Sequence, residues 1–188
     1  MKLGLFSLPG AITSYRQAVD YAKSCGIAAI EPYCDREFAL PDVDAARRLA
    51  DYAGEQGIAI CCFSMAVDVA AEDNTAEIER LKKYADVAAA LGSLFLHHTL
   101  LPGLTHDFSR LPFSQLLKRA VQSIRTVFDY AEQVGVKCVY EDQGYVFNGS
   151  ERFERLIDAV DREIGVVADL GNSLFVGEQP EVFVGRFA

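Results

Sequence analysis

The segment GVKCVYED, residues 135–142, contains the pattern that decides the fold class. Gly135 follows a helical stretch, a short apolar run comes next, and two acidic residues close it. Glycine is favoured where a helix ends, because without a Cβ it adopts the left-handed backbone at little cost. The apolar run lacks a clean alternation of polar and apolar residues, which is typical of a parallel strand buried on both faces.

The same unit recurs along the whole chain. Further helical stretches end at Gly26, Gly57, Gly92 and Gly165, and each is followed by a short apolar run. Alternating helices and strands predict an α/β fold in which helices cover parallel strands. With the N-terminal run included, the predicted strands are residues 3–7, 27–33, 58–65, 93–99, 136–142 and 166–170.

Helix signals fit this scheme. We expect helices to begin near Ser14, Asp42, Asn74, Pro112 and Ser150, and a sixth to begin at Pro180 with Val182, Phe183 and Phe187 facing inward. The closed TIM-type (β/α) barrel needs eight units of about 30 residues each. We therefore interpret residues 1–188 as a single incomplete parallel barrel domain with six of the eight units, strands seven and eight being absent.

Composition excludes several classes of protein. The net charge is −9, with 27 acidic against 18 basic residues, and the basic residues are scattered, so nucleic acid is not an expected partner. No apolar run is long enough to span a membrane, and nothing resembles a signal peptide. Five cysteines without a CxxC spacing indicate a reducing, cytoplasmic setting. The absence of GxSxG, P-loop and GxGxxG motifs disfavours nucleophilic and nucleotide-dependent enzymes.

Acidic residues close three of the apolar strands. In a parallel barrel the carboxyl ends of all strands meet at one mouth, and Glu31, Glu141 and Asp169 lie at such ends. A carboxylate placed there is costly unless it is paired or bound to a cation. Glu141 and Asp169, on adjacent strands, therefore predict a divalent cation site. The alternative for each acid is an ion pair or a helix N-terminus at the sheet edge.

Three histidines fall within ten residues, at 97, 98 and 106. His97 and His98 are adjacent on a predicted strand, so their side chains point to opposite faces. We expect one of them to face the site and the other to pack against a helix, without deciding which. A zinc site formed by all three is disfavoured, and His106 is predicted to lie in a loop. Asn172 is expected either to bind a substrate hydroxyl or to cap the following helix.

Three segments resemble the xylose isomerase-like TIM barrels, the sugar phosphate isomerase/epimerase family: GIAAIEPY (26–33), VKCVYEDQG (136–144) and VVADLGNSLFVGEQP (166–180). The resemblance implies that Glu141 and Asp169 bind one divalent metal ion (Mn, Mg, Co or Zn). In the family, a histidine on strand seven and a glutamate on strand eight complete the site, and neither position exists in these 188 residues. The family's strand-four histidine corresponds to His97 or His98.

The resemblance also implies a reaction. It is the isomerisation or epimerisation of a small sugar, a sugar phosphate or a hydroxy-keto acid by proton abstraction through an enediolate. Glu141 would be both metal ligand and catalytic base. Glu31, His97, His98 and Asn172 would bind the hydroxyl groups of the substrate.

Two alternatives remain open at this stage. One is a metal-dependent hydrolase or lyase of the endonuclease IV-like barrel group, which the acidic charge and Asn172, in place of a family histidine, disfavour. The other is an inactive fragment that self-associates through open sheet edges. We expect a homo-oligomer, and we expect that the 188-residue chain alone does not catalyse the reaction.

Overall fold

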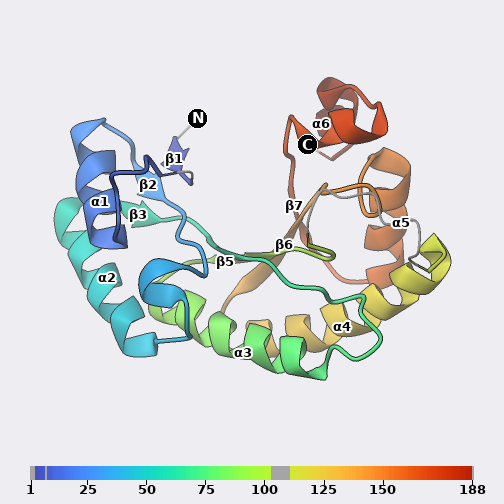
Figure 1. Ribbon diagram of the computed structural model, residues 1–188, viewed down its shortest axis with the longest axis horizontal. Coiled ribbons are helices and arrows are strands. Elements are labelled where there is room, and N and C mark those ends of the chain that lie inside the picture. The colour runs from blue at the N-terminus through green and yellow to red at the C-terminus, as the bar shows by residue number, and fades with distance from the viewer. Residues whose placement is uncertain (1–2, 7, 103–110, 188) are drawn as a thin grey trace. The chain divides into compact units, whose positions relative to one another are not determined.

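The computed structural model describes residues 3–6, 8–102 and 111–187, and His106, predicted to lie in a loop, is outside these ranges. Within them, short strands alternate with α-helices along the chain (Figure 1). The strands are β1 (Gly4–Leu5), β2 (Ala29–Ile30), β3 (Ala59–Ile60), β4 (Phe63–Met65), β5 (Phe95–His98), β6 (Lys137–Glu141) and β7 (Gly165–Val167). The helices are α1 (Tyr15–Ser24), α2 (Val43–Gln56), α3 (Thr75–Ala90), α4 (Phe113–Gln133), α5 (Ser150–Val160) and α6 (Pro180–Phe187), with short 3-10 turns at Arg36–Phe38 and Asn172–Val176.

The predicted α/β class with parallel strands is confirmed. One sheet has the order β1-β2-β3 and the other the order β4-β5-β6-β7. Strand β2 pairs in parallel with both β1 and β3, and β6 pairs in parallel with β7, where Glu141 is in register with Val167. None of the helices in the described ranges is both long and apolar enough to cross a bilayer.

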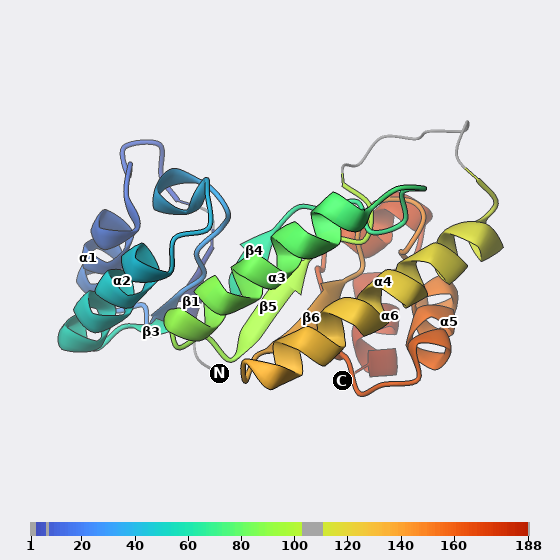
Figure 2. The ribbon, with the colours of Figure 1, turned by 90° about the horizontal axis from the view of Figure 1, so that it is seen from below.

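The chain divides into two compact units. The first comprises residues 1–65, 82–97 and 131–137, and the second comprises residues 66–81, 98–130 and 138–188. In the first unit, α1 and α2 pack side by side against the β1-β2-β3 sheet (Figure 1), and the ring of Phe63 stacks on that of Tyr84. In the second unit, α6 packs beside α5 (Figure 2), with the rings of Phe153 and Phe183 5.5 Å apart.

The sequence signals at helix ends are confirmed at several positions. Asp42 caps α2 by accepting a hydrogen bond from the backbone N–H of Ala45, which satisfies one of the orphan donors of the first turn. Gly57 ends the same helix with a φ of 72°, a left-handed conformation that disfavours side chains. In α6, Phe183 is buried as predicted, but Val182 is exposed, so only part of the predicted inner face is correct.

The predicted third strand, residues 58–65, is wrong as a single strand because the structure divides it into β3 and β4. The N–H of Cys61 donates to the carbonyl oxygen of Ile30. In a regular parallel ladder, the N–H of residue 32 would next donate to the carbonyl oxygen of Cys61. Residue 32 is Pro32, which has no N–H. Pairing resumes one residue out of step, where Tyr33 pairs with Ser64. The extra residue is a β-bulge, and it determines how Ser64 is presented.

Close packing between β6 and β7 gives a first testable prediction. A methyl group on Gly165 would lie 2.6 Å from Cγ1 of Val139. We expect Gly165→Ala to lower the free energy of unfolding by about 1–3 kcal/mol, because over-packing strains a core. The matched control is Gly54→Ala in α2, where a methyl group meets nothing within 4 Å and stability should rise by up to about 1 kcal/mol. Chemical denaturation measures both, and equal changes in the two variants would contradict this account.

Candidate functional site

The first candidate cluster lies where β6 and β7 end, in the second unit. Glu141 is the last residue of β6, and Asp169 follows the end of β7 by two residues. Both carboxylates are half-buried. Because β6 and β7 are paired parallel strands, their carboxyl ends lie at the same edge of the sheet, the edge at which parallel α/β proteins form their sites.

Asn172 joins the two carboxylates. Its side-chain Nδ2 donates to Oε1 of Glu141 at 2.9 Å, and its backbone N–H donates to Oδ1 of Asp169 at 3.2 Å. The N–H of Gly171 donates to the same Asp169 oxygen at 2.7 Å. Asn172 is itself the first residue of the 3-10 turn Asn172–Val176, and Gly171 occupies the N-cap position of that turn. The structure therefore brings three of the predicted site residues into one hydrogen-bonded cluster, although their chemical roles stay predictions.

Further residues support this cluster. Nε2 of Gln143 donates to Oε2 of Glu141 at 3.3 Å. The buried Asn148 donates to the carbonyl oxygens of Asn172 and Gly144, at 2.7 and 2.8 Å. Sequence reasoning missed Gln143 and Asn148, whose only signal is their place in the loop that follows a strand ending in an acid.

Asp142 is fully buried next to Glu141. Its Oδ1 accepts the backbone N–H of Asp169 at 2.8 Å, and its Oδ2 has no hydrogen-bond partner among the described residues. Burial raises the pKa of Asp142 to about 6, two backbone hydrogen bonds oppose the rise, and the negative charges of Asp169 and Glu178 add to it. This end of the sheet is therefore a region of negative charge.

The donor chemistry of the cluster fits a divalent cation. Carboxylate oxygens are the ligands that hard divalent ions prefer. A cation would also offset the negative charges of Asp169 and Glu178 that act on Asp142. The set is incomplete: in the described ranges, no three histidine, cysteine, aspartate or glutamate side chains are placed together to hold a metal. A divalent ion held by Glu141 and Asp169 would therefore need further ligands.

The second candidate cluster belongs to the first unit. Glu31 follows β2, Ser64 lies in β4 and His97 lies in β5. The Ser64 hydroxyl donates to Oε1 of Glu31, and Oγ of Ser64 lies 3.1 Å from Nδ1 of His97. Ser64 is completely buried. Sequence reasoning missed Ser64, because a single serine within an apolar run is common in buried strands and gives no sign of a functional role.

His98 occupies the opposite face from His97, as the strand geometry predicted. It is fully buried, its Nδ1 lies 3.0 Å from the carbonyl oxygen of Thr99, and its ring meets that of Tyr140 edge-on at 4.9 Å. His98 meets Tyr140 of β6, because β5 and β6 are neighbours in the sheet. That one of the two histidines packs against a helix stays a prediction. The role of His98 in binding substrate also stays a prediction.

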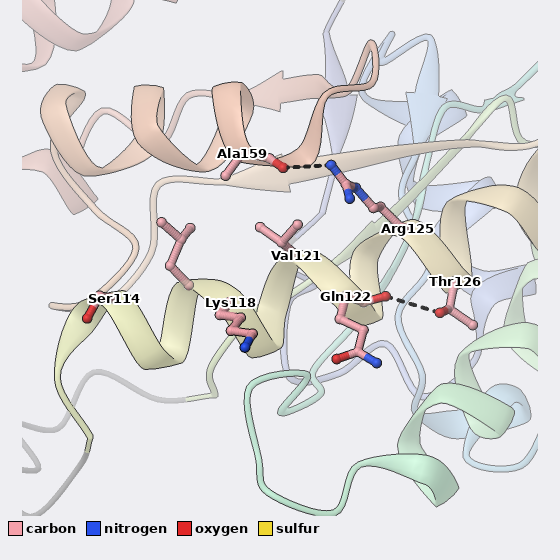
Figure 3. Close-up of a pocket in the computed structure, with 8 residues that line it drawn as sticks. Ser114, Lys118, Val121, Gln122, Arg125, Thr126 and Ala159 are labelled. Atoms are coloured by element: carbon pink, nitrogen blue, oxygen red, sulfur yellow. Dashed lines mark hydrogen bonds between the residues drawn. The ribbon is translucent and has the colours of Figure 1, made fainter.

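A pocket also lies on the outside of the second unit, over α4 (Figure 3). It has a volume of about 610 Å³, and its lining includes Leu117, Lys118 and Val121 but no carboxylate. Arg125 donates to the carbonyl oxygens of Val160 and Ala159 at 2.9 and 3.0 Å, which places a cation at the C-terminus of α5. These contacts stabilise helix packing, and the pocket has none of the groups that the predicted chemistry needs.

The burial of His97 gives a second testable prediction. Burial lowers the pKa of His97 from 6.5 to about 4. The unfolded chain therefore takes up a proton near pH 6.5 that the folded chain accepts only near pH 4, so stability falls as the pH falls through this window. Glu31 acts in the opposite sense, because burial raises its pKa and the folded chain then accepts a proton more readily.

We expect His97→Gln to remove the histidine contribution. Relative to its stability at pH 7, the variant should lose less on transfer to pH 4.5 than the native chain, by about 2–3 kcal/mol at 1.36 kcal/mol per pKa unit. Urea unfolding at the two pH values measures the difference. Parallel pH dependence in the two proteins would show that His97 titrates normally.

The family model described as "Xylose isomerase-like TIM barrel" matches residues 19–186. No curated protein was found to match the chain.

Three solved structures show the same fold. D-psicose 3-epimerase from Clostridium cellulolyticum H10, solved with D-tagatose, is 17% identical with a TM-score of 0.72, over 88% of this chain and 62% of that one. The IolI protein, solved with a bound zinc atom, is 20% identical with a TM-score of 0.78, over 95% and 66%. An AP endonuclease, family 2, from Brucella melitensis is 15% identical with a TM-score of 0.79, over 99% and 75%. The chain spans 62% of the length of the D-psicose 3-epimerases that it matches.

Proposed function

Because the chain belongs to the xylose isomerase-like TIM barrel family, we propose that it contains the carboxylate part of a metal-dependent isomerase or epimerase site. The substrate class is a small sugar, a sugar phosphate or a hydroxy-keto acid. The observation that carries the proposal is the cluster in which Asn172 joins Glu141 to Asp169 at the ends of β6 and β7. The epimerase and the zinc-containing IolI protein among the structures of this fold support it.

Glu141 and Asp169 are the residues that would hold the ion. A divalent ion bound there would polarise the carbonyl group of the substrate and so acidify the neighbouring C–H bond. Two carboxylates leave such an ion with most of its coordination positions unfilled. The proposal therefore requires further ligands beyond these two residues.

In this proposal Glu141 is the group that moves the proton. Its two oxygens accept hydrogen bonds from Asn172 and Gln143, which restrict the orientation of the carboxylate. A carboxylate held in this way would take a proton from the carbon next to the carbonyl group and return it to the former carbonyl carbon. The sugar is isomerised when the proton of the neighbouring hydroxyl also passes to the former carbonyl oxygen. Epimerisation needs a second group on the opposite face of the substrate. The backbone N–H groups of Gly171 and Asn172 hold the Asp169 carboxylate in place. Its position therefore does not depend on a bound substrate.

The experiment that tests the proposal follows solvent deuterium into a panel of ketoses and hydroxy-keto acids. The protein is studied in the longest form in which it is made, with Mn²⁺ present and its binding measured separately. Incorporation of deuterium next to the carbonyl group supports the proposal. No exchange across the panel while Mn²⁺ is bound would refute it, and two or three bound ions per chain would instead favour phosphoester hydrolysis.

A further inference from the structure

Glu31, Ser64 and His97 form a continuous line of hydrogen bonds inside the first unit. Glu31 follows β2, Ser64 lies in β4 and His97 lies in β5. Ser64 is the middle residue and contacts the other two. The bulge opposite Pro32 shifts the register of β4 by one residue, so that Tyr33 rather than Cys34 pairs with Ser64. His97 is only 9% exposed and Ser64 is not exposed, so water competes little for these bonds.

The number of protons on this line fixes its direction. A serine hydroxyl has a single proton to donate, and here it is donated to Glu31. When Glu31 is ionised, the contact between Ser64 and His97 must therefore be donated by the Nδ1–H of the ring. When Glu31 is protonated, the line can reverse: Glu31 donates to Ser64, Ser64 donates to Nδ1, and the ring proton sits on Nε2. The two arrangements differ by one proton.

We propose that Glu31, Ser64 and His97 are a proton relay that ends on the Glu31 carboxylate. A proton that binds to Nε2 of His97 releases the proton of Nδ1, which forms a new O–H bond on Ser64. The original O–H bond of Ser64 breaks as that proton bonds to Glu31, and the reverse sequence releases it again. The imidazole ring is neutral before and after the transfer.

The burial of the cluster favours a neutral His97 ring with the added proton on Glu31. Burial lowers the pKa of His97 to about 4, so the ring does not retain the proton, and burial raises the pKa of Glu31, which makes that carboxyl a better acceptor. The neighbouring thiols of Cys61 and Cys62 have raised pKa values, that of Cys62 reaching about 12, through burial and the charge of Glu31. Both thiols therefore stay neutral while Glu31 titrates.

In turnover, the relay would exchange a proton with an oxygen atom of a bound substrate. This role in turnover rests on the proposed function, whereas the relay itself does not. The sequence resemblance implies only that Glu31 and His97 bind the hydroxyl groups of a substrate. The buried hydroxyl between them is the feature that adds acid–base chemistry.

The test is a titration of His97 by side-chain ¹⁵N NMR, with ¹³C detection of the Glu31 carboxyl and with His97→Gln used to assign the ring signals. In the native chain we expect Nδ1 to be protonated above the midpoint of Glu31 and Nε2 below it, with one shared midpoint and a neutral ring on both sides. Nδ1 staying protonated throughout the Glu31 titration, or a doubly protonated ring at that midpoint, would overturn the relay.

Three variants keep the test valid even if one of the variant proteins does not fold. Glu31→Gln should hold His97 in one tautomer over the whole pH range. Ser64→Ala should separate the protonation of Glu31 from the tautomer exchange of His97. Ser64→Thr, which restores a hydroxyl, should bring the two events back to one midpoint. A tautomer exchange that persists in Glu31→Gln would overturn the relay. If the NMR result fails while deuterium exchange into a ketose occurs, only the relay is wrong; if the NMR result holds without such exchange, only the proposed function is wrong.

Discussion

Glu141→Gln is expected to reduce deuterium exchange between solvent and the substrate by about 10²–10⁴-fold, the contribution typical of a positioned general base. A glutamine amide cannot accept the carbon proton, yet its oxygen can still accept the hydrogen bond that Asn172 donates to Glu141. The fold should therefore be retained while the proton transfer is lost. The measurement is the rate of exchange under saturating Mn²⁺, with unfolding curves to confirm that stability is unchanged within about 1 kcal/mol.

The matched control for this variant is Glu163→Gln, which neutralises an exposed carboxylate in the turn before β7. It should exchange deuterium at the native rate, so that loss of one negative charge is separated from loss of the base. Native exchange in Glu141→Gln would remove Glu141 from the mechanism, whatever the metal content of the variant.

Asp169→Asn is expected to weaken Mn²⁺ binding by at least about 100-fold, because replacing even a residue that only supports a ligand costs 10–100-fold in metal affinity. The substitution removes a charge but leaves an oxygen that accepts the N–H groups of Gly171 and Asn172. The turn after β7 should therefore persist. Calorimetric titration with Mn²⁺ measures the affinity directly and does not depend on turnover.

Asp161→Asn is the control for Asp169→Asn. Asp161 is exposed and has a φ of 53°, a left-handed conformation that asparagine adopts as readily as aspartate. Its replacement should leave Mn²⁺ affinity unchanged. Equal affinities in Asp169→Asn and the native chain would show that Asp169 is not a ligand.

Local signals predicted the helices well, because a cap or a terminal glycine acts within one turn. Asp42 and Gly57 bound α2 as expected. The division of the third strand was less visible, since it arises from Pro32 in the neighbouring strand, which removes an N–H that the ladder would use. Strand pairing depends on residues distant in sequence, and a reading of one segment at a time misses such an effect.

The site was predictable where strand ends alone determine it. Glu141 and Asp169 follow from the rule that parallel strands end at one edge, and the structure joins them through Asn172. The choice between His97 and His98 was not predictable, because alternation along a strand gives opposite faces without naming their neighbours. The structure supplies the neighbours, since His97 meets Ser64 and His98 meets Tyr140, while the choice of the one that faces the site stays a prediction.

The most direct test of the account is the position of a bound ion. Crystals grown with Mn²⁺ and measured at its absorption edge would show the ion by anomalous scattering. We expect a single peak within bonding distance of carboxylate oxygens of both Glu141 and Asp169. A peak bonded to neither residue, or no peak at a Mn²⁺ concentration that saturates the protein in solution, would contradict the account.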